Sequence, residues 1–123
     1  MAEQGTKKFR LCVDAALKKK AFDLLALDIR EHSSFADFFI ICSGSSNRQV
    51  QAIANSIEMD LKKQGIYPLG IEGFNEATWI LLDYDEVIIH VFYQPVREFY
   101  QLERLWVDAP RIECSEGYIT KVK

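Results

Sequence analysis

A continuous apolar run that leads directly into an amphipathic helix limits the folds open to this chain more than any other feature. The run covers residues 37–43 and reads Asp-Phe-Phe-Ile-Ile-Cys-Ser, with no polar residue between its ends. Such continuity is typical of a central strand that is covered on both faces. A glycine turn follows, and apolar residues then recur at helical spacing: Val50, Ile53, Ala54, Ile57 and Leu61. A strand, a turn and a helix in this order form the first half of a βαβ unit, so we expect an α/β fold.

The rest of the chain supplies a helix before this unit, and a hairpin and a second helix after it. Apolar periodicity predicts a helix over 11–25, a short strand over 26–29, strands over 69–72, 78–83 and 87–93, and a helix from Pro95 to Val107. The short gap between the strands at 78–83 and 87–93 favours an antiparallel hairpin. The sequence therefore predicts a single α/β domain with a mixed sheet of about five strands flanked by helices.

Length and charge restrict the organisation and the partners of the chain. With 123 residues it holds one domain, which we place at residues 11–107 between a flexible N-terminus at 1–10 and a C-terminal tail at 108–123. Lys and Arg number 15 and Asp and Glu number 18, so the formal net charge is −3. This mild acidity excludes a broad basic surface. If the chain binds an assembly that contains nucleic acid, it should therefore contact a protein of that assembly or use a local patch.

Cysteine and histidine spacing argues against a disulfide framework and against a metal centre. Cys12, Cys42 and Cys114 form an odd set without close pairs, and His32 lies far from His90 in the sequence. We expect Cys42 to be a buried core thiol, and we expect no metal and no cofactor. The chain lacks the apolar core of a signal peptide and any apolar run near the ~20 residues of a membrane helix. We therefore expect a reduced, soluble, cytoplasmic protein.

Two segments carry groups that could support chemistry. The turn at Gly44 and Ser45 lies where a strand meets a helix, and free N–H groups there could hold a phosphate, although no P-loop or dinucleotide-binding motif is present. Asp83, Asp85 and Glu86 lie at the hairpin tip, and grouped carboxylates can bind Mg²⁺. A capped turn and a solvated hairpin tip explain the same residues without a ligand, and we favour that simpler account.

The stretch 79–83 indicates a binding surface. Trp79, Leu81 and Asp83 face one side of a strand, while Ile80 and Leu82 face the other. If helices cover only one side of the sheet here, a large aromatic residue and a leucine remain exposed, which monomers rarely tolerate without a partner. If helices cover both sides, all of these residues belong to the core.

Several segments occur together in an order and spacing that a known family shares. They include Leu27-Asp28-Ile29, Asp37-Phe38-Phe39-Ile40-Ile41-Cys42-Ser43-Gly44, Ser46-Asn47-Arg48, Gly65-Ile66-Tyr67-Pro68, Trp79-Ile80-Leu81-Leu82-Asp83, His90-Val91-Phe92, Phe99-Tyr100-Gln101-Leu102-Glu103 and Leu105-Trp106. On these segments, over roughly residues 12–107, the chain resembles the ribosomal silencing factor family, also called the Iojap family. Gln49, Asp85, Glu86 and Pro95 depart from the residues that are usual in the family. None of these departures lies within 79–83.

The resemblance implies a nucleotidyltransferase-like fold and a translation factor without enzymatic activity. Family members bind the large ribosomal subunit through large-subunit ribosomal protein fourteen, block its association with the small subunit, and so repress translation. On this basis we expect a partner-binding set made of Trp79, Leu81, Leu82, Asp83, Asp85 and Glu86. The apolar members would dock on the ribosomal protein, and the acidic members would orient its basic side chains.

Two other functions are open at this point. An active nucleotidyltransferase would use the turn at Gly44 and Ser45 together with paired metal-binding carboxylates shortly after it, but residues 49–53 supply none. Alternatively, the exposed side chains near Trp79 could join two copies of the chain into a homodimer, instead of or besides binding the ribosome.

Overall fold

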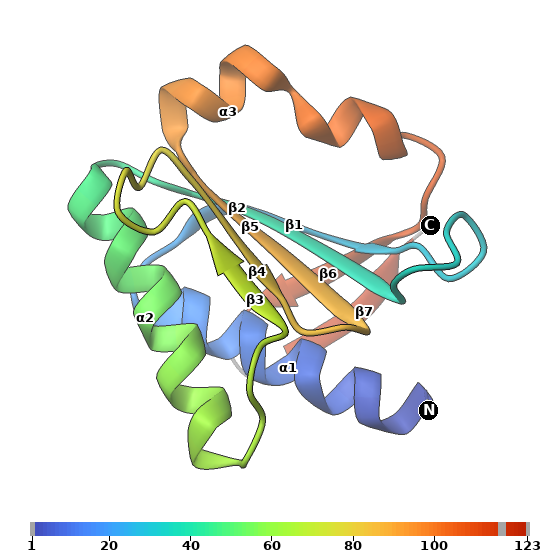
Figure 1. The fold of residues 1–123 in the computed structure, drawn as a ribbon. Helices are drawn as coiled ribbons and strands as arrows, with labels where there is room; N and C mark the ends of the chain where they lie inside the picture. The colour runs from blue at the N-terminus through green and yellow to red at the C-terminus, as the bar shows by residue number, and fades with distance from the viewer. Residues whose placement is uncertain (1, 116–117, 123) are drawn as a thin grey trace.

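One mixed sheet with helices on both sides makes up the structure (Figure 1). The computed structural model describes residues 2–115 and 118–122. In chain order the elements are α1 (Ala2–Lys18), β1 (Phe22–Asp28), β2 (Phe38–Gly44), α2 (Asn47–Lys63), β3 (Gly70–Glu72), β4 (Trp79–Asp83), β5 (Val87–Tyr93), α3 (Gln94–Tyr100), the 3-10 helix η1 (Leu102–Trp106), β6 (Arg111–Ser115) and β7 (Tyr118–Val122). The strands lie in the order β3-β4-β5-β2-β1-β6-β7, so the predicted α/β class with a mixed sheet is confirmed.

Strand β2 lies at the centre of the sheet, as its continuous apolar run predicts. It pairs in parallel with β5 and antiparallel with β1, and all of its residues are buried. Phe38, Ile40 and Cys42 belong to the larger core beneath α1 and α2. Phe39 belongs to a smaller cluster on the other face. Burial on both faces explains why this strand shows no alternation of apolar and polar residues.

Helix α2 begins and ends at local signals. The Ser46 hydroxyl accepts a hydrogen bond from the Gln49 N–H at 3.0 Å, and Gly65 follows the helix with a φ of +74°. The predicted apolar stripe of the helix is buried against the sheet. Strand β3 runs parallel to β2, because β3–β4 and β4–β5 are antiparallel pairs and β5–β2 is a parallel pair. Together β2, α2 and β3 form the expected βαβ unit.

The N-terminal segment differs from the expectation of a flexible stretch at 1–10. Helix α1 starts at Ala2, and the side chain of Phe9 is buried. Lys8 Nζ donates to the carbonyl oxygen of Tyr84 at 3.0 Å and forms an ion pair with Glu86, so the first half of α1 is tied to the β4–β5 turn. One aromatic residue among polar neighbours gives too weak a periodicity to reveal this docking from the sequence.

Helix α1 ends earlier in the sequence than predicted, because the expected helix extended over 11–25. The helix ends at Lys18, and Lys20 adopts a φ of +65°. Leu24 and Leu25 lie in β1, which pairs with β2. Strand pairing with the central strand therefore overrides the helical spacing of these leucines, because β structure depends strongly on tertiary context.

The segment at 108–123, predicted to be a C-terminal tail outside the domain, contains two strands. Strand β6 pairs antiparallel with β1, opposite Ala26 and Leu27, and also with β7. The described sheet therefore has seven strands instead of about five. Without β6 the hydrogen-bonding edge of β1 would lie open, and covering such an edge is a physical reason for these residues to be ordered.

Helices cover the two faces of the sheet unequally (Figure 1). Helices α1 and α2 pack on one face and form the larger core with it. Helices α3 and η1 lie over the other face, which we call the outer face, and neither has a buried residue. The helix predicted from Pro95 to Val107 is interrupted at Gln101, where φ is +49°. None of the helices in the described ranges has the length and hydropathy needed to cross a membrane.

Candidate functional site

Strand β4 presents two sets of side chains to opposite faces of the sheet. Ile80 and Leu82 are fully buried in the larger core. Trp79, Leu81 and Asp83 are partly exposed on the outer face, and we call these three residues the β4 patch. The interpretation in which helices bury both sets is therefore wrong for this strand. Including Leu82 in the partner-binding set is also wrong, because its exposed fraction is 0% and it cannot touch a partner.

The indole ring of Trp79 is held by aromatic neighbours and by one hydrogen bond. Its Nε1–H donates to Nδ1 of His90 at 3.0 Å. Its ring lies 4.8 Å from the ring of Phe92 and 5.2 Å from that of Tyr100, measured between centroids. The position of the indole ring is therefore set before any partner binds. Such preorganisation reduces the entropy lost on binding.

His90 is a neutral, buried hydrogen-bond acceptor. Its exposed fraction is 4%, and desolvation lowers its pKa to about 4. Because Nδ1 accepts from Trp79, the proton of the neutral imidazole lies on Nε2. Nε2 is buried and has no hydrogen-bond partner among the described residues. The imidazole thus uses one nitrogen to hold the tryptophan, and the other nitrogen is unused.

We predict that stability depends on pH through His90. Its pKa is about 4 in the folded chain and about 6.5 in the unfolded chain, so unfolding takes up a proton between these values. The free energy of unfolding should therefore decrease as the pH falls through this window, by at most about 3 kcal/mol. Denaturant titrations of the wild type and of His90→Asn from pH 7 to pH 4 measure this effect. A decrease of equal size in the two proteins would contradict it.

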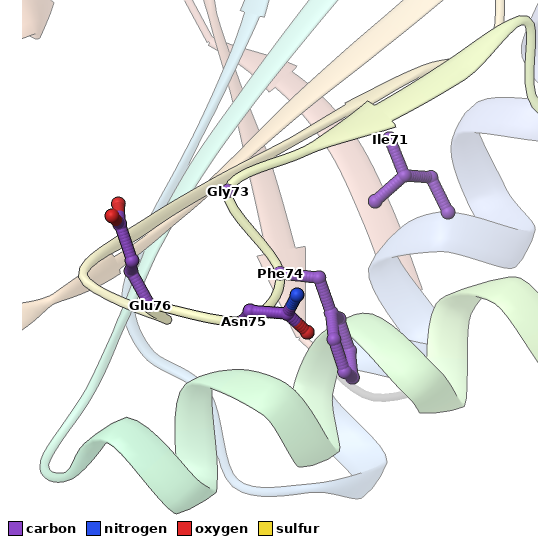
Figure 2. A pocket seen from close by; sticks show the side chains of 5 residues that line it. All are labelled: Ile71, Gly73, Phe74, Asn75 and Glu76. Atoms are coloured by element: carbon purple, nitrogen blue, oxygen red, sulfur yellow. The ribbon is translucent and has the colours of Figure 1, made fainter.

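The loop that leads into β4 is held by α2 (Figure 2). Gln51 Nε2 donates to the carbonyl oxygen of Phe74 at 2.9 Å, and Asn47 Nδ2 donates to that of Ala77 at 3.0 Å. In Figure 2 the ring of Phe74 points toward α2. The loop and β3 border an open hollow of about 420 Å³ lined by Ile71, Gly73, Phe74, Asn75 and Glu76. Two side-chain amides of α2 thus set the point at which β4 and its patch begin.

The acidic residues of the β4–β5 turn do not act as one group. Asp83 Oδ1 accepts from the N–H of Asp85 at 2.9 Å, and Asp85 adopts a φ of +74°. Glu86 pairs with Lys8 of α1, whose hydrogen bond lowers the pKa of that carboxyl group. Asp83, a member of the β4 patch, is partly exposed, and Asp85 is exposed in the turn that follows it. Glu86 is already engaged by Lys8, contrary to its expected role. Across the described ranges, no three His, Cys, Asp or Glu side chains are placed to hold a metal ion.

The turn at Gly44 and Ser45 is closed by a side chain from its own helix. The N–H and the hydroxyl of Ser45 donate to Oε1 of Gln49 at 2.6 and 2.9 Å. Nε2 of Gln49 donates to the carbonyl oxygens of Lys19 and Lys20 at 3.2 and 3.1 Å. The N–H of Ser45 that a phosphate would need is therefore occupied, which favours a capped turn over a phosphate site.

We predict that Gln49 stabilises the fold by joining the turn at Gly44 and Ser45 to the turn at Lys19 and Lys20 that follows α1. In Gln49→Ala the carbonyl oxygens of Lys19 and Lys20 and the N–H of Ser45 lose a partner, and the free energy of unfolding should fall by about 1–2 kcal/mol. Denaturant unfolding measures the change. Arg48→Ala, at the neighbouring exposed position, is the matched control and should shift stability by less than about 0.5 kcal/mol. Equal losses in the two variants would rule out this role of Gln49.

The exposed apolar surface continues from the β4 patch onto α3 and η1. Tyr100 contacts Trp79, and the rings of Phe99 and Tyr100 lie 5.0 Å apart. The large apolar side chains exposed on this segment are Phe99, Tyr100, Leu105 and Val107. The helix predicted from Pro95 to Val107 does not by itself imply that these side chains are exposed. Periodicity shows that residues share a face, but it does not show whether another element covers that face.

Arg97 joins α3 to the sheet through hydrogen bonds. Arg97 Nη1 donates to the carbonyl oxygen of Asp23 at 2.6 Å and to the hydroxyl of Ser43 at 2.8 Å. The side chain of Glu103 in η1 lies 3.6 Å from Arg97 Nε. These contacts hold Tyr100 over the outer face, where it meets Trp79.

The fold and this surface define a small α/β protein whose candidate site is an exposed aromatic patch on one sheet face. Residues 2–123 match the family model described as "Ribosomal silencing factor during starvation". The chain belongs to the ribosomal silencing factor family.

Individual relatives agree with this assignment. The chain is 44% identical over 111 residues to "Ribosomal silencing factor RsfS" of Halalkalibacterium halodurans, covering 90% of this chain and 94% of that protein. It is 44% identical over 108 residues to the Bacillus subtilis protein of the same name, covering 88% and 92%. A crystal structure of a Chromobacterium violaceum protein is similar with a TM-score of 0.81, 33% identity and 92% coverage of both chains. A more distant relative is the mouse "Mitochondrial assembly of ribosomal large subunit protein 1", 27% identical over 99 residues, covering 78% and 43%.

Proposed function

We propose that this chain represses translation by binding the large ribosomal subunit through large-subunit ribosomal protein fourteen. In this account it docks through the β4 patch and occupies the face at which the small subunit would join. The observation that carries the proposal is the partly exposed pair of Trp79 and Leu81 on the outer face of a ribosomal silencing factor, with the indole of Trp79 held by His90. Steric occupation alone accounts for repression, and it requires no catalytic group.

The chemistry of the patch fits a protein partner better than ribosomal RNA. The chain has a net charge of −3. Asp83 shares the outer face of β4 with Trp79 and Leu81, and Asp85 lies in the turn that follows this strand. Carboxylates at this place would repel phosphates, but they would attract basic side chains of a protein and set the register of docking. Trp79 and Leu81 supply the apolar centre that binding hot spots require.

The family supports the ribosome as the target and a regulatory role, not an enzymatic one. Its bacterial members are called ribosomal silencing factors, and the mouse relative is named for assembly of the large ribosomal subunit. Such a target implies that the chain acts in the cytoplasm. The nucleotidyltransferase alternative gains no support from the turn at Gly44 and Ser45, because Gln49 occupies the N–H of Ser45.

A subunit-joining assay tests this proposal. Light scattering follows purified small and large subunits as they associate after preincubation of the large subunit with the chain. The wild type should reduce joining, and Leu81→Glu should restore it by placing an uncompensated charge at the apolar centre of the patch. Met59→Glu, an equally drastic change at an exposed position of α2, should inhibit like the wild type. Undiminished joining with the wild type would refute the proposal.

A second experiment separates ribosome binding from self-association. Sedimentation of the free chain shows whether two copies associate through the patch. If the patch serves both purposes, Leu81→Glu should be monomeric as well as inactive, and ribosomal protein fourteen should compete with the dimer.

A further inference from the structure

Within residues 2–115 and 118–122, His90 is a buried polar side chain whose hydrogen bonds do not account for its burial. Among the described residues the buried polar or charged side chains are Asp28, Ser43, Ser56 and His90. Asp28 pairs with Arg30, Ser43 accepts from Arg97, and Ser56 donates to a carbonyl oxygen of α1. His90 uses only Nδ1 and leaves Nε2–H without a partner in the described ranges. A buried donor without an acceptor costs stability, so packing alone would favour an apolar residue here.

The position of His90 in the sheet explains how it reaches Trp79. In the antiparallel pair of β4 and β5, Leu81 lies opposite His90 and Trp79 lies opposite Phe92. His90 is therefore the direct neighbour of one apolar member of the β4 patch and the diagonal neighbour of the other. From that position its Nδ1 receives the indole N–H of Trp79.

Ring contacts alone leave the orientation of the indole open. Phe92 and Tyr100 pack on Trp79 at centroid distances of 4.8 and 5.2 Å, and both can also contact an indole that has flipped about the bond between Cβ and the ring. A hydrogen bond to one atom, Nε1, is directional and defines which edge of the indole points into the sheet. The opposite edge is then the one shown to a partner.

We propose that His90 is a positioning residue, which fixes the indole of Trp79 so that one edge of the ring is presented for docking. This inference rests on the proposed function, because it explains how the docking surface is prepared before the ribosomal protein arrives. Phe39, at a centroid distance of 4.9 Å, packs against the imidazole from β2 and keeps it in place. His90 touches no partner itself, because it is buried.

The experiment compares two substitutions that differ in the acceptor. His90→Phe fills the space but removes the acceptor, whereas His90→Asn places an amide oxygen close to the position of Nδ1. Proton–nitrogen NMR spectra of the indole groups, assigned with Trp79→Phe, report the hydrogen bond directly. Binding to purified large subunits is measured on the same samples, and thermal unfolding shows that each variant is folded. His32→Asn, at the exposed histidine, is the matched control.

His90→Phe should move the Trp79 indole signal upfield, speed its exchange with water, and weaken binding by about fivefold to tenfold. His90→Asn should recover most of both properties, and His32→Asn should change neither. An unchanged indole signal in His90→Phe would overturn the inference, as would a changed signal with unchanged binding. If the wild type itself fails to bind, the proposed function falls, and the indole signal then decides separately whether His90 holds Trp79.

Discussion

Leu82→Ala should lower the free energy of unfolding by about 2–5 kcal/mol, because Leu82 is fully buried in the larger core. Its removal leaves a cavity between β4 and the helices that cover this face. For a domain of ordinary stability this loss is a large fraction of the total. Urea titration followed by circular dichroism measures it. Binding to the large subunit should be retained wherever the variant is folded, since the side chain does not reach the surface.

Leu81→Ala is the matched control on the opposite face of the same strand. Leu81 is only partly buried, so its removal should cost about 1–2 kcal/mol of stability, less than that of Leu82. Its effect should appear in binding, because it belongs to the β4 patch. If Leu81→Ala unfolded the chain and Leu82→Ala abolished binding without a loss of stability, the assignment of the two faces would be reversed.

Gly73→Ala should destabilise the chain by about 3–5 kcal/mol, because two effects combine at this position. Gly73 has a φ of +81°, and an added Cβ would lie 2.3 Å from the backbone oxygen of Trp79. That oxygen belongs to β4 and cannot move away unless the strand shifts. The clash therefore disturbs both the loop of Figure 2 and the placement of the β4 patch.

Gly65→Ala separates the clash from the backbone strain. Gly65 has a similar φ of +74°, but an added Cβ would meet nothing within 4 Å. This variant should therefore lose only about 1–2 kcal/mol, the cost of a left-handed conformation for alanine. Thermal unfolding of the two variants gives the comparison. Equal losses at the two glycines would show that contact with Trp79 plays no part.

Local patterns were sufficient to predict the centre of the fold. The unbroken apolar run of β2 and the helical stripe of α2 are strong signals that do not depend on distant residues. The alternation of Trp79 and Leu81 with their neighbours likewise separates the faces of β4 correctly. The predicted site and fold agree best with the structure where short-range periodicity and tertiary packing favour the same arrangement.

The errors arise where distant parts of the chain decide the structure. Glu86 looked available for a partner, but its ion pair with Lys8 joins residues that are 78 positions apart. Leu82 belongs to the contiguous segment on which the family resemblance rests, but its side chain faces the core. Strand β6 lies in the segment predicted to be a tail, and the edge of β1 that it covers exists only once the sheet is assembled.

Co-sedimentation of the wild type and of Trp79→Ala with purified large ribosomal subunits tests the central claim most directly. Trp79 is the largest member of the β4 patch, and loss of a hot-spot tryptophan costs about 2 kcal/mol or more, or about thirtyfold in affinity. Circular dichroism of the same samples confirms that the variant is folded. We predict that the wild type sediments with the subunit and that Trp79→Ala stays in the supernatant. Binding of Trp79→Ala as tight as that of the wild type would contradict it.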